Sequence, residues 1–199
     1  TLVTTPVSIE SQGMLEVRAD TVLAGTRYAD AVLVACGLVP AAWQFREGDR
    51  MLAGAVAGTV GGSFRGMLLA ERTLLNLLQR ACGIATMTRQ YVDAISGTGC
   101  ILLDTRKTIP GLRVLEKYAT RMGGATNHRM GLWDAAMIKD NHVAVAGGVA
   151  EAVARARNAG VERIILEVDS IAQIEPGLAA GASHLLLDNM DADTLREAV

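Results

Sequence analysis

The chain has 199 residues, of which 50% are hydrophobic and 20% are charged, and its formal net charge at pH 7 is −2. This composition excludes an intrinsically disordered chain, and the nearly neutral balance argues against a nucleic-acid-binding surface. Charged residues interrupt the apolar ones so often that no run reaches the roughly 18 residues of a membrane-spanning helix. Aromatic residues make up only 4% and there are 21 glycines, so we expect an aliphatic core in alternating strands and helices with tight connections.

Basic residues are unevenly distributed along the chain. Only three of the 19 basic residues are lysines, namely Lys107, Lys117 and Lys139. The window from Asp104 to His142 holds seven basic and four acidic residues, so the remainder of the chain is acidic. A basic island in an acidic protein indicates a small anionic ligand, and the charged surface of helices is the alternative interpretation.

The three cysteines, Cys36, Cys82 and Cys100, lie far apart and show no metal-ligand spacing. Reduced thiols in a cytoplasmic protein are therefore expected. No positively charged segment followed by an apolar run opens the chain, as it does in a secretion signal. The chain begins with Thr1 rather than Met and in the middle of a pattern, so we expect that the natural protein has earlier residues.

The first part of the chain, residues 1–62, has the pattern of a small mixed α/β domain. Loose alternation predicts a half-buried strand over 8–18, and helical spacing of apolar residues predicts a helix over 26–36. After the turn signal Gly48-Asp49, an apolar run predicts a strand over 51–60.

A glycine-rich junction separates this strand from a long predicted helix. Gly61 and Gly62 are expected to end the strand, and Ser63 is expected to cap the helix. Gly83 is expected to interrupt the helix, so that residues 91–95 belong to a second one.

From Cys100 onward, short aliphatic runs alternate with helical stretches, which is typical of a parallel sheet covered by helices. The predicted strands are 101–103, 136–138, 164–166 and 185–187. The predicted helices are 114–122, 149–158, 171–180 and 193–199. Gly160 and Gly181 stand where helix C-caps belong. We assign residues 63–199 to this second domain, and residues 1–62, with part of the long helix that follows, to the first.

A charged residue follows each predicted strand of the second domain: Asp104, Lys139, Glu167 and Asp188. In parallel α/β sheets and barrels, ligands bind at the carboxyl ends of the strands. One such charge alone is usually the start of a solvated loop, but here every predicted strand has one. We therefore expect the four charged groups to converge on one binding mouth.

Two further segments carry neighbouring cations. In the segment 104–108, the planar guanidinium of Arg106 beside the flexible Lys107 suits a carboxylate or phosphate. In the second segment, paired glycines precede His128 and Arg129, and such glycines let backbone amides approach a ligand. Surface charge on a loop is the alternative for the first segment, and a structural histidine is the alternative for the second.

The mouth also combines a lysine with carboxylates. Burial of the Lys139 ammonium requires an anionic partner, which Asp140, Glu167 or a bound anion can supply. His142 either takes part in the site or only caps the loop. Glu167 and Asp188 can hold Mg²⁺ or ribose hydroxyls, or can act as an acid/base pair. This mixture fits a multiply charged anion, such as a sugar diphosphate with Mg²⁺, that meets an acidic second substrate.

Longer motifs extend these observations over nearly the whole chain. The most specific motif is DTRKT at 104–108, which is followed by Pro110, Gly111 and Arg113. Shorter motifs stand at 71–76, 83–86, 127–129, 139–142, 167–168 and 187–189. In order and spacing, these motifs resemble quinolinate phosphoribosyltransferase, also called nicotinate-nucleotide pyrophosphorylase (carboxylating).

The resemblance implies an α/β fold with an N-terminal mixed α/β domain and a C-terminal, incomplete α/β barrel. It also implies a cytoplasmic glycosyltransferase that works as a homodimer or a larger assembly, without nucleic acid or membrane as partner. The reaction transfers phosphoribosyl from phosphoribosyl pyrophosphate (PRPP) to the ring nitrogen of quinolinate. Pyrophosphate and CO₂ leave, and nicotinate mononucleotide forms for NAD synthesis. Because the family's later glycine-rich phosphate segment would follow Val199, we expect the chain to be truncated at both ends.

By motif position, the resemblance implies that Arg106, His128, Arg129 and Lys139 hold the carboxylates of quinolinate. It also implies that Arg72 reaches into the site of the neighbouring subunit. Quinolinate is a dianion, so its pocket needs several donors, and bidentate arginine suits carboxylates.

The resemblance further implies that Thr105 binds substrate and that Lys107 serves either the quinolinate pocket or the phosphates of PRPP. It implies that Glu167 and Asp188 serve the ribose and the Mg²⁺ of PRPP. Together with Lys139, these two carboxylates are the expected catalytic residues. Loss of pyrophosphate builds positive charge on the ribose ring, which nearby carboxylates stabilise. The ribosylated ring nitrogen is cationic and accepts electrons from C2, so the carboxylate at C2 can leave as CO₂.

The sequence departs from the family pattern at two positions. Ala125 stands where the family usually has a third consecutive glycine, and Cys82 stands where it commonly has serine. Two other functions stay open: a related enzyme of the same fold, such as the one linked to molybdenum uptake, acting on another acid; and a binding protein without turnover.

Overall fold

The computed structural model describes residues 9–199, which form two compact units. The first unit ends at His128 and the second extends from Arg129 to Val199, and each is described by itself. The predicted boundary after residue 62 falls within the first unit, one residue before the end of the strand Val56–Ser63, so the division into domains at that point stays a prediction.

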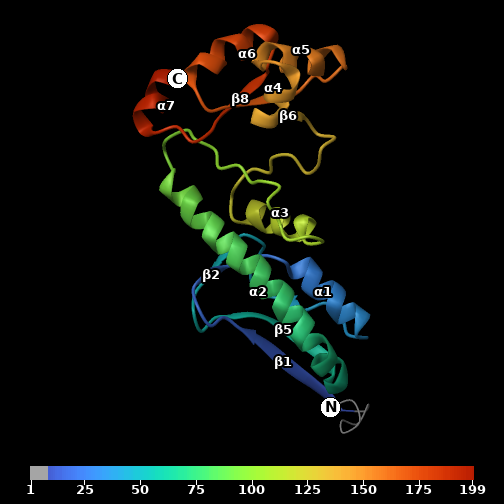
Figure 1. Ribbon diagram of the computed structural model, residues 1–199. Helices are drawn as coiled ribbons and strands as arrows, with labels where there is room; N and C mark the ends of the chain where they lie inside the picture. The colour runs from blue at the N-terminus through green and yellow to red at the C-terminus, as the bar shows by residue number, and fades with distance from the viewer. Residues whose placement is uncertain (1–8) are drawn as a thin grey trace. The chain divides into compact units, whose positions relative to one another are not determined.

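The first unit contains two small antiparallel sheets (Figure 1). In the larger sheet, β5 (Val56–Ser63) lies between β1 (Glu10–Glu16) and β3 (Ala42–Trp43). In the smaller sheet, β2 (Thr21–Val22) pairs with β4 (Arg50–Met51). Strand β1 confirms the middle of the strand predicted over 8–18, whereas Ile9, Val17 and Arg18 lie outside β1 and Ser8 lies outside the described residues.

The prediction of one strand over 51–60 is wrong, because the chain turns within that range. Gly54 adopts a φ of 86°, and its amide donates to the Val17 carbonyl at 2.8 Å. The Val17 amide in turn donates to the Ala55 carbonyl at 2.9 Å. These two hydrogen bonds hold the reversal between β4 and β5, and the apolar pattern alone does not reveal it.

The prediction that Gly61 and Gly62 end the strand is also wrong. Both residues belong to β5, where Gly61 pairs with Gln12 and Gly62 with Ser11. Hydrogen bonding to the neighbouring strand β1 outweighs the weak strand preference of glycine.

Helix α2 (Phe64–Ala94) is the longest element, with 31 residues. The Ser63 hydroxyl accepts a hydrogen bond from the Gly66 amide at 3.0 Å, which confirms the predicted N-cap. The helix passes through Gly83 without a break, so the predicted interruption and the separate helix over 91–95 are wrong. A glycine inside a helix costs about 1 kcal/mol relative to alanine. The buried face of α2 offsets this cost.

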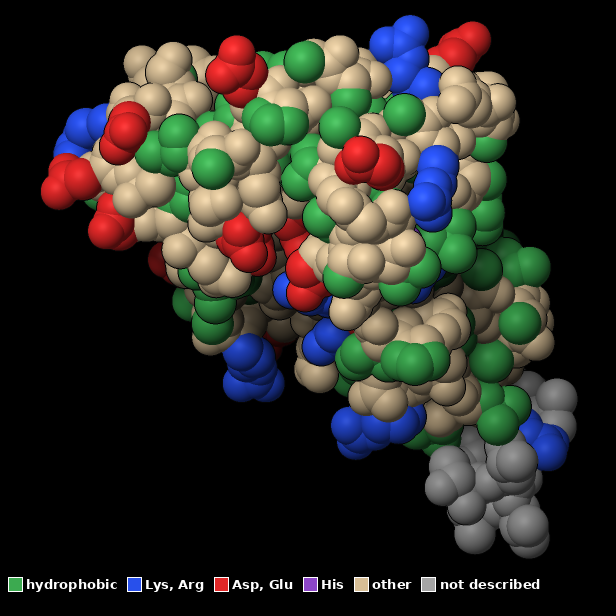
Figure 2. Space-filling model, turned by 45° about the horizontal axis from the view of Figure 1, so that its top comes forward, with side chains coloured by type: hydrophobic (Ala, Val, Ile, Leu, Met, Phe, Trp, Pro, Cys, Tyr) green, Lys and Arg blue, Asp and Glu red, His purple; other side chains and the backbone are tan. Residues whose placement is uncertain are grey.

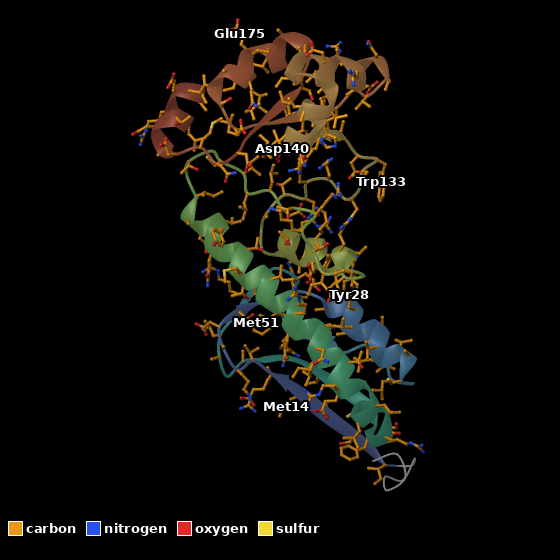
Figure 3. The ribbon with its side chains drawn as sticks, in the orientation of Figure 1. Met14, Tyr28, Met51, Trp133, Asp140 and Glu175 are labelled. Atoms are coloured by element: carbon orange, nitrogen blue, oxygen red, sulfur yellow. The ribbon has the colours of Figure 1, made fainter. Side chains whose placement is uncertain are left out.

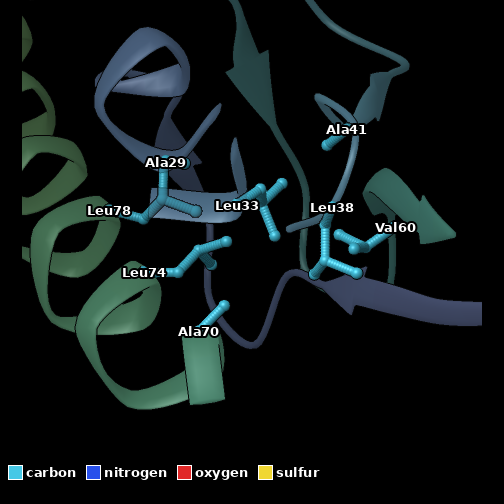
Figure 4. Packing of buried hydrophobic residues seen from close by; sticks show 8 residues of the cluster. All are labelled: Ala29, Leu33, Leu38, Ala41, Val60, Ala70, Leu74 and Leu78. Atoms are coloured by element: carbon cyan, nitrogen blue, oxygen red, sulfur yellow. The ribbon is translucent and has the colours of Figure 1, made fainter. Parts of the chain in front are cut away.

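That buried face packs against α1 (Thr26–Ala35), which confirms the helix predicted over 26–36 (Figure 4). The cluster shown in Figure 4 consists of Ala29, Leu33, Leu38, Ala41, Val60, Ala70, Leu74 and Leu78. The buried face of α2 that contacts α1 consists of Ala70, Leu74 and Leu78, so the two helices pack through aliphatic side chains. The aliphatic core expected from the composition is therefore present.

Helix α3 (Arg113–Met122) also packs against α2, through Leu115 and Ala119. The segment 101–103 before it was predicted to be a strand of the parallel sheet. Instead, it forms only an isolated parallel bridge between Leu103 and Thr126, inside the first unit. The prediction of a full strand is therefore wrong.

The second unit is built on a parallel sheet of β6 (Ala136–Ile138), β7 (Ile164–Val168) and β8 (His184–Leu187), in that order. This confirms three of the predicted strands and the α/β class. Helices α4 (Asp140–Ala146) and α5 (Val149–Asn158) connect the first two strands.

A short 3₁₀ turn, η1 (Ile171–Gln173), leads into α6 (Ile174–Ala180), and α7 (Ala192–Ala198) ends the unit. Gly181 is the C-cap of α6, with a φ of 102°, as predicted. The central strand β7 is buried on both faces, because four of its five side chains are inaccessible. Figure 1 shows the helices of this unit packed around its strands.

The surface shows no continuous apolar belt on the face in view in Figure 2, where hydrophobic side chains lie in groups between charged ones. Among residues 9–199, no helix combines the length and the apolar character that a membrane crossing requires.

Candidate active site

The carboxylate of Asp104 is the centre of a buried hydrogen-bond cluster in the first unit. Its Oδ1 atom pairs with the Lys117 ammonium and accepts a hydrogen bond from the His128 amide at 2.7 Å. Its Oδ2 atom accepts one from Asn127 Nδ2 at 2.7 Å. The side chain of Asp104 is only 5% exposed. These contacts use the carboxylate internally, so the expectation that Asp104 adds a free charge to the binding mouth is wrong.

The segment that follows Asp104 carries the predicted anion-binding cations. Thr105 and Lys107 are exposed, and the Thr105 hydroxyl accepts a hydrogen bond from the Lys107 amide at 3.0 Å. Arg106 is half-buried, and its Nε atom is inaccessible to solvent and has no hydrogen-bond partner among residues 9–199. A buried donor without an acceptor is costly. The guanidinium of Arg106 therefore fits an acidic ligand.

Internal hydrogen bonds stiffen this segment. The Arg106 carbonyl accepts from the Thr108 amide at 2.9 Å and from Arg113 Nη2 at 3.3 Å. The Glu116 carboxylate accepts from the Ile109 amide at 3.2 Å. The turn is thus fastened to α3 at two points.

A cavity of about 370 Å³ adjoins the same segment within the first unit. Thr105 and Lys107 line it together with Arg80, Met87, Tyr91 and Leu103. This volume is within the range of small-molecule sites. Arg106 and His128 do not line the cavity, so the cavity contains only some of the binding residues predicted for this unit.

Two other predicted residues of the first unit lie apart from the cavity. His128 is half-buried, and its backbone is fixed by Asp104. Arg72 is exposed on α2 and forms no hydrogen bond or ion pair with the described part of the chain. An exposed arginine of this kind can reach a neighbouring subunit, but a single chain leaves that role a prediction.

In the second unit, Lys139 and Glu167 form an ion pair, with 2.5 Å between Nζ and Oε2. Of the partners that the sequence left open for Lys139, the structure selects Glu167. The side chain of Lys139 is 45% exposed and that of Glu167 is 15% exposed, so solvent reaches this pair. Glu167 lies inside β7 rather than after it, which corrects the predicted strand end.

Asp188 follows β8 directly, and its amide donates to the Val168 carbonyl at 2.9 Å. In the parallel register, Glu167 is opposite Leu186, and side chains two residues apart along a strand share a face. Asp188 and Glu167 therefore lie on the same face of the sheet, near its carboxyl edge. The next residue, Asn189, has a φ of 55° and donates to the Asp188 carboxylate at 2.9 Å, which shapes the loop.

His142 caps a helix. Its Nδ1 atom accepts a hydrogen bond from the Lys139 amide at 3.0 Å, at the start of α4, where Figure 3 labels Asp140. The sequence analysis placed His142 in a loop, whereas residues 140–146 form this helix. Of the two roles left open for His142, the structure supports capping.

Arg129 is 8% exposed and is bound within its own loop. Its guanidinium donates to the Ala135 carbonyl at 3.0 Å and contacts the Met137 sulfur at 3.1 Å. The loop between them carries Trp133, which is 81% exposed and points outward (Figure 3). These contacts of Arg129 hold in place the loop that leads into β6.

Cys82 takes part in the packing of α2 against the segment that contains Ala24. Its sulfur accepts a hydrogen bond from the Ala24 amide at 3.4 Å and donates to the Ala24 carbonyl at 3.5 Å. Burial raises the pKa of the Cys82 thiol, so it stays protonated at neutral pH. It makes the two hydrogen bonds of a serine hydroxyl, which accounts for this departure from the family pattern.

Residues 9–199 contain no cluster of three or more His, Cys, Asp or Glu side chains that could hold a metal ion by themselves. Glu167 and Asp188 supply two carboxylates at the sheet edge. Mg²⁺ is commonly bound by one or two carboxylates together with substrate phosphates. The donor set therefore fits a Mg²⁺ ion that phosphates of a substrate help to hold.

The sequence did not predict the roles of Lys117, Asn127 and Glu116, which hold the binding segments in place. Lys117 was noted only for its rarity, and Asn127 only as part of a motif. Their partners are distant in the sequence, so no local pattern pairs them.

Comparison with known proteins supplies the family. A model of the quinolinate phosphoribosyl transferase C-terminal domain matches residues 84–199, and the model of the N-terminal domain matches residues 1–82. The chain belongs to the quinolinate phosphoribosyl transferase family. The resemblance seen in the motifs is therefore confirmed.

Individual members of the family support this assignment. The chain is 49% identical to the nicotinate-nucleotide pyrophosphorylase [carboxylating] of Mycobacterium leprae, over 74% of this chain and 52% of that protein. It is 46% identical to the probable enzyme of the same name from Synechocystis, over 77% of this chain and 52% of that protein. The chain spans about half the length of these curated relatives.

Solved structures share the fold. NadC from Streptococcus pyogenes is 38% identical and superposes with a TM-score of 0.93, over 98% of this chain and 70% of that one.

Proposed function

We propose that the protein containing this chain transfers phosphoribosyl from PRPP to quinolinate with decarboxylation, which yields nicotinate mononucleotide, pyrophosphate and CO₂. Membership of the family and the names of the relatives support this reaction. The observation that carries the proposal is the Lys139–Glu167 ion pair, which shares a sheet face with Asp188. Cation and carboxylates lie together at the edge where ligands of parallel sheets bind.

On this proposal, Arg106, His128, Arg129 and Lys139 recognise the two carboxylates of quinolinate. The buried Nε of Arg106, which has no partner in residues 9–199, supports its role as a donor. Arg129 has protein partners, so it serves by bracing its loop as much as by direct contact.

PRPP is bound by Thr105 and Lys107 through its phosphates and by Glu167 and Asp188 through its ribose. The exposure of Thr105 and Lys107 beside a cavity supports the first assignment. Mg²⁺, held by Glu167, Asp188 and the phosphates, would neutralise the pyrophosphate that leaves.

In the transfer step, the quinolinate nitrogen forms a bond to C1 of the ribose. The bond from C1 to pyrophosphate breaks, and its electron pair leaves with the pyrophosphate oxygen. Glu167 and Asp188 stabilise the positive charge that develops on the ribose ring. Lys139 holds a substrate carboxylate and, through its ion pair, the orientation of Glu167.

Decarboxylation follows from the charge on the product ring. The ribosylated nitrogen is cationic, so it stabilises the electron pair that the broken bond to the carboxylate leaves on C2. CO₂ leaves, and a proton takes its place on C2. No covalent enzyme intermediate is required.

The test uses the full-length protein, quinolinate and PRPP, with and without Mg²⁺, and measures nicotinate mononucleotide and CO₂. Product formation that depends on Mg²⁺ supports the proposal. Preference for nicotinate over quinolinate would point to a related enzyme acting on another acid. Binding of PRPP without release of pyrophosphate would point to a binding protein. Either result would refute the proposed reaction.

We also infer a cytoplasmic homodimer in which Arg72 acts in the neighbouring site. The free state of the three cysteines agrees with a reducing compartment. Mixing an Arg72→Ala protein with a Lys139→Ala protein tests the shared site, because mixed dimers regain one intact site. If mixing restores no activity although mixed dimers form, Arg72 acts within its own subunit.

A further inference from the structure

A buried lysine in the first unit has no role in the proposed chemistry. Lys117 lies on α3, its residue is 1% exposed, and its ammonium pairs with Asp104. Burying an ammonium and a carboxylate is costly even when they pair. A contact of this kind calls for an explanation other than stability.

We propose that Asp104 and Lys117 are positioning residues, which hold the quinolinate-binding groups Arg106 and His128 in their binding geometry. This inference rests on the proposed function and assigns a new role within it. Both residues line the cavity of about 370 Å³, but their charged groups pair with each other within the protein.

The connection to His128 is direct. Asp104 Oδ1 accepts from the His128 amide at 2.7 Å, and Oδ2 accepts from Asn127 Nδ2 at 2.7 Å. Asn127 Nδ2 also donates to the Lys117 carbonyl at 2.8 Å. The carboxylate therefore fastens two successive residues of one binding segment.

The connection to Arg106 runs along the backbone. Asp104 is two residues earlier, and its amide donates to the Thr126 carbonyl at 3.2 Å. Arg113 then holds the Arg106 carbonyl from α3, the helix that also carries Lys117. The two binding segments and α3 thus meet at one buried carboxylate.

A comparison with hydrophobic residues at the same two positions shows that the ion pair serves to position its neighbours rather than to stabilise the fold. Replacing a buried ion pair by hydrophobic residues of similar volume is often neutral or stabilising. Such a replacement at Asp104 and Lys117 would leave the His128 amide without its acceptor and Asn127 with the Lys117 carbonyl alone. The ion pair thus supplies placement of these groups, which hydrophobic packing cannot supply.

The experiment compares the full-length enzyme with Asp104→Asn and with the double variant Asp104→Leu/Lys117→Met. The double variant leaves no unpaired buried charge, so it retains a folded core. We expect the KM for quinolinate to rise about tenfold or more in both, because small displacements of binding groups have large effects. The KM for PRPP should change much less than the KM for quinolinate. Unfolding of both variants should remain cooperative.

Leu33→Ala is the matched control, because Leu33 is buried in the same unit and distant in sequence from both binding segments. It lowers the melting temperature without moving Arg106 or His128, so its KM for quinolinate should stay unchanged. This control separates lost stability from lost placement.

An unchanged KM for quinolinate in the folded variants, a fall in kcat alone, or loss of folding in both variants would overturn the inference and leave the proposed function standing. Absence of turnover in the unmodified enzyme would overturn the proposed function, and the inference with it.

Discussion

The two lysine–carboxylate pairs of this chain have opposite surroundings. In the first unit, the side chains of Lys117 and Asp104 are 2% and 5% exposed, and neighbouring groups use both carboxylate oxygens. In the second unit, the side chains of Lys139 and Glu167 are 45% and 15% exposed. The same two functional groups are closed in one pair and open to solvent in the other.

This difference distinguishes an ion pair that maintains the structure from one that can bind a ligand. A closed pair cannot exchange its partner for a ligand without leaving a charge buried. An open pair can, because water screens the charges and the contact itself contributes little to stability. The open pair is therefore the one that we expect to meet substrate.

Removing one member of the closed pair should have the largest effect on stability. Asp104→Ala leaves Lys117 buried without a partner, which costs about 3–5 kcal/mol of unfolding free energy. Urea denaturation of the full-length protein measures this loss. Asp193→Ala is the control, because it breaks an exposed pair with Arg196 and should change stability by less than about 1 kcal/mol. Equal losses in the two variants would contradict the distinction between closed and open pairs.

The open pair should show the reverse behaviour. Lys139→Ala removes a group that holds the substrate carboxylate, so we expect kcat/KM to fall by about 10²–10³-fold. The unfolding free energy should change by less than about 1 kcal/mol. Arg196→Ala, which removes a different exposed cation, should leave both quantities unchanged. The rate of nicotinate mononucleotide formation measures the first effect, and urea denaturation measures the second. Full turnover by the Lys139→Ala variant would show that Lys139 does not bind the substrate.

The fold was predictable where local patterns act alone. The three strands of the parallel sheet have continuous apolar residues, and α1 and α5 have helical spacing, so their positions follow from the sequence. The predictions failed where distant segments decide. Pairing with β1 keeps Gly61 and Gly62 in a strand. Packing of α2 against β2 and α3, on either side of Gly83, keeps α2 continuous through that glycine.

The candidate site divides in the same way. The charges at the carboxyl ends of β6 and β8 were visible in the sequence, because each follows an apolar run. The closed pair was not, because helical periodicity places Lys117 on the opposite face of α3 from Leu115 and Ala119 and so predicts exposure. The Lys117 ammonium is buried because it pairs with Asp104, which lies 13 residues earlier in the sequence. The motifs contain Asp104 and Asn127 but do not show which residues pair.

A smaller effect on binding should distinguish Arg106 from a simple positive charge. Arg106→Lys keeps the charge but loses the planar fork that suits a carboxylate. We expect the KM for quinolinate to rise by about tenfold and the KM for PRPP to change little. Steady-state kinetics with each substrate varied in turn measures both values. A rise in the KM for PRPP alone would assign Arg106 to the phosphates instead.

The smallest effect concerns an exposed carboxylate of the second unit, and it depends on pH. Asp191 caps α7, and hydrogen bonds from the backbone and side chain of Thr194 lower the pKa of its carboxyl group. The folded state therefore favours the ionised form. The resulting stabilisation is complete above the pKa of the unfolded chain, near 4, and is lost as the pH falls through the lower folded value. Asp191→Asn removes the charge, so its melting temperature should lie slightly below that of the unmodified protein at neutral pH. The two melting temperatures should converge in acid, whereas a constant gap down to pH values of about 2–3 would show that the charge of Asp191 contributes nothing to the cap.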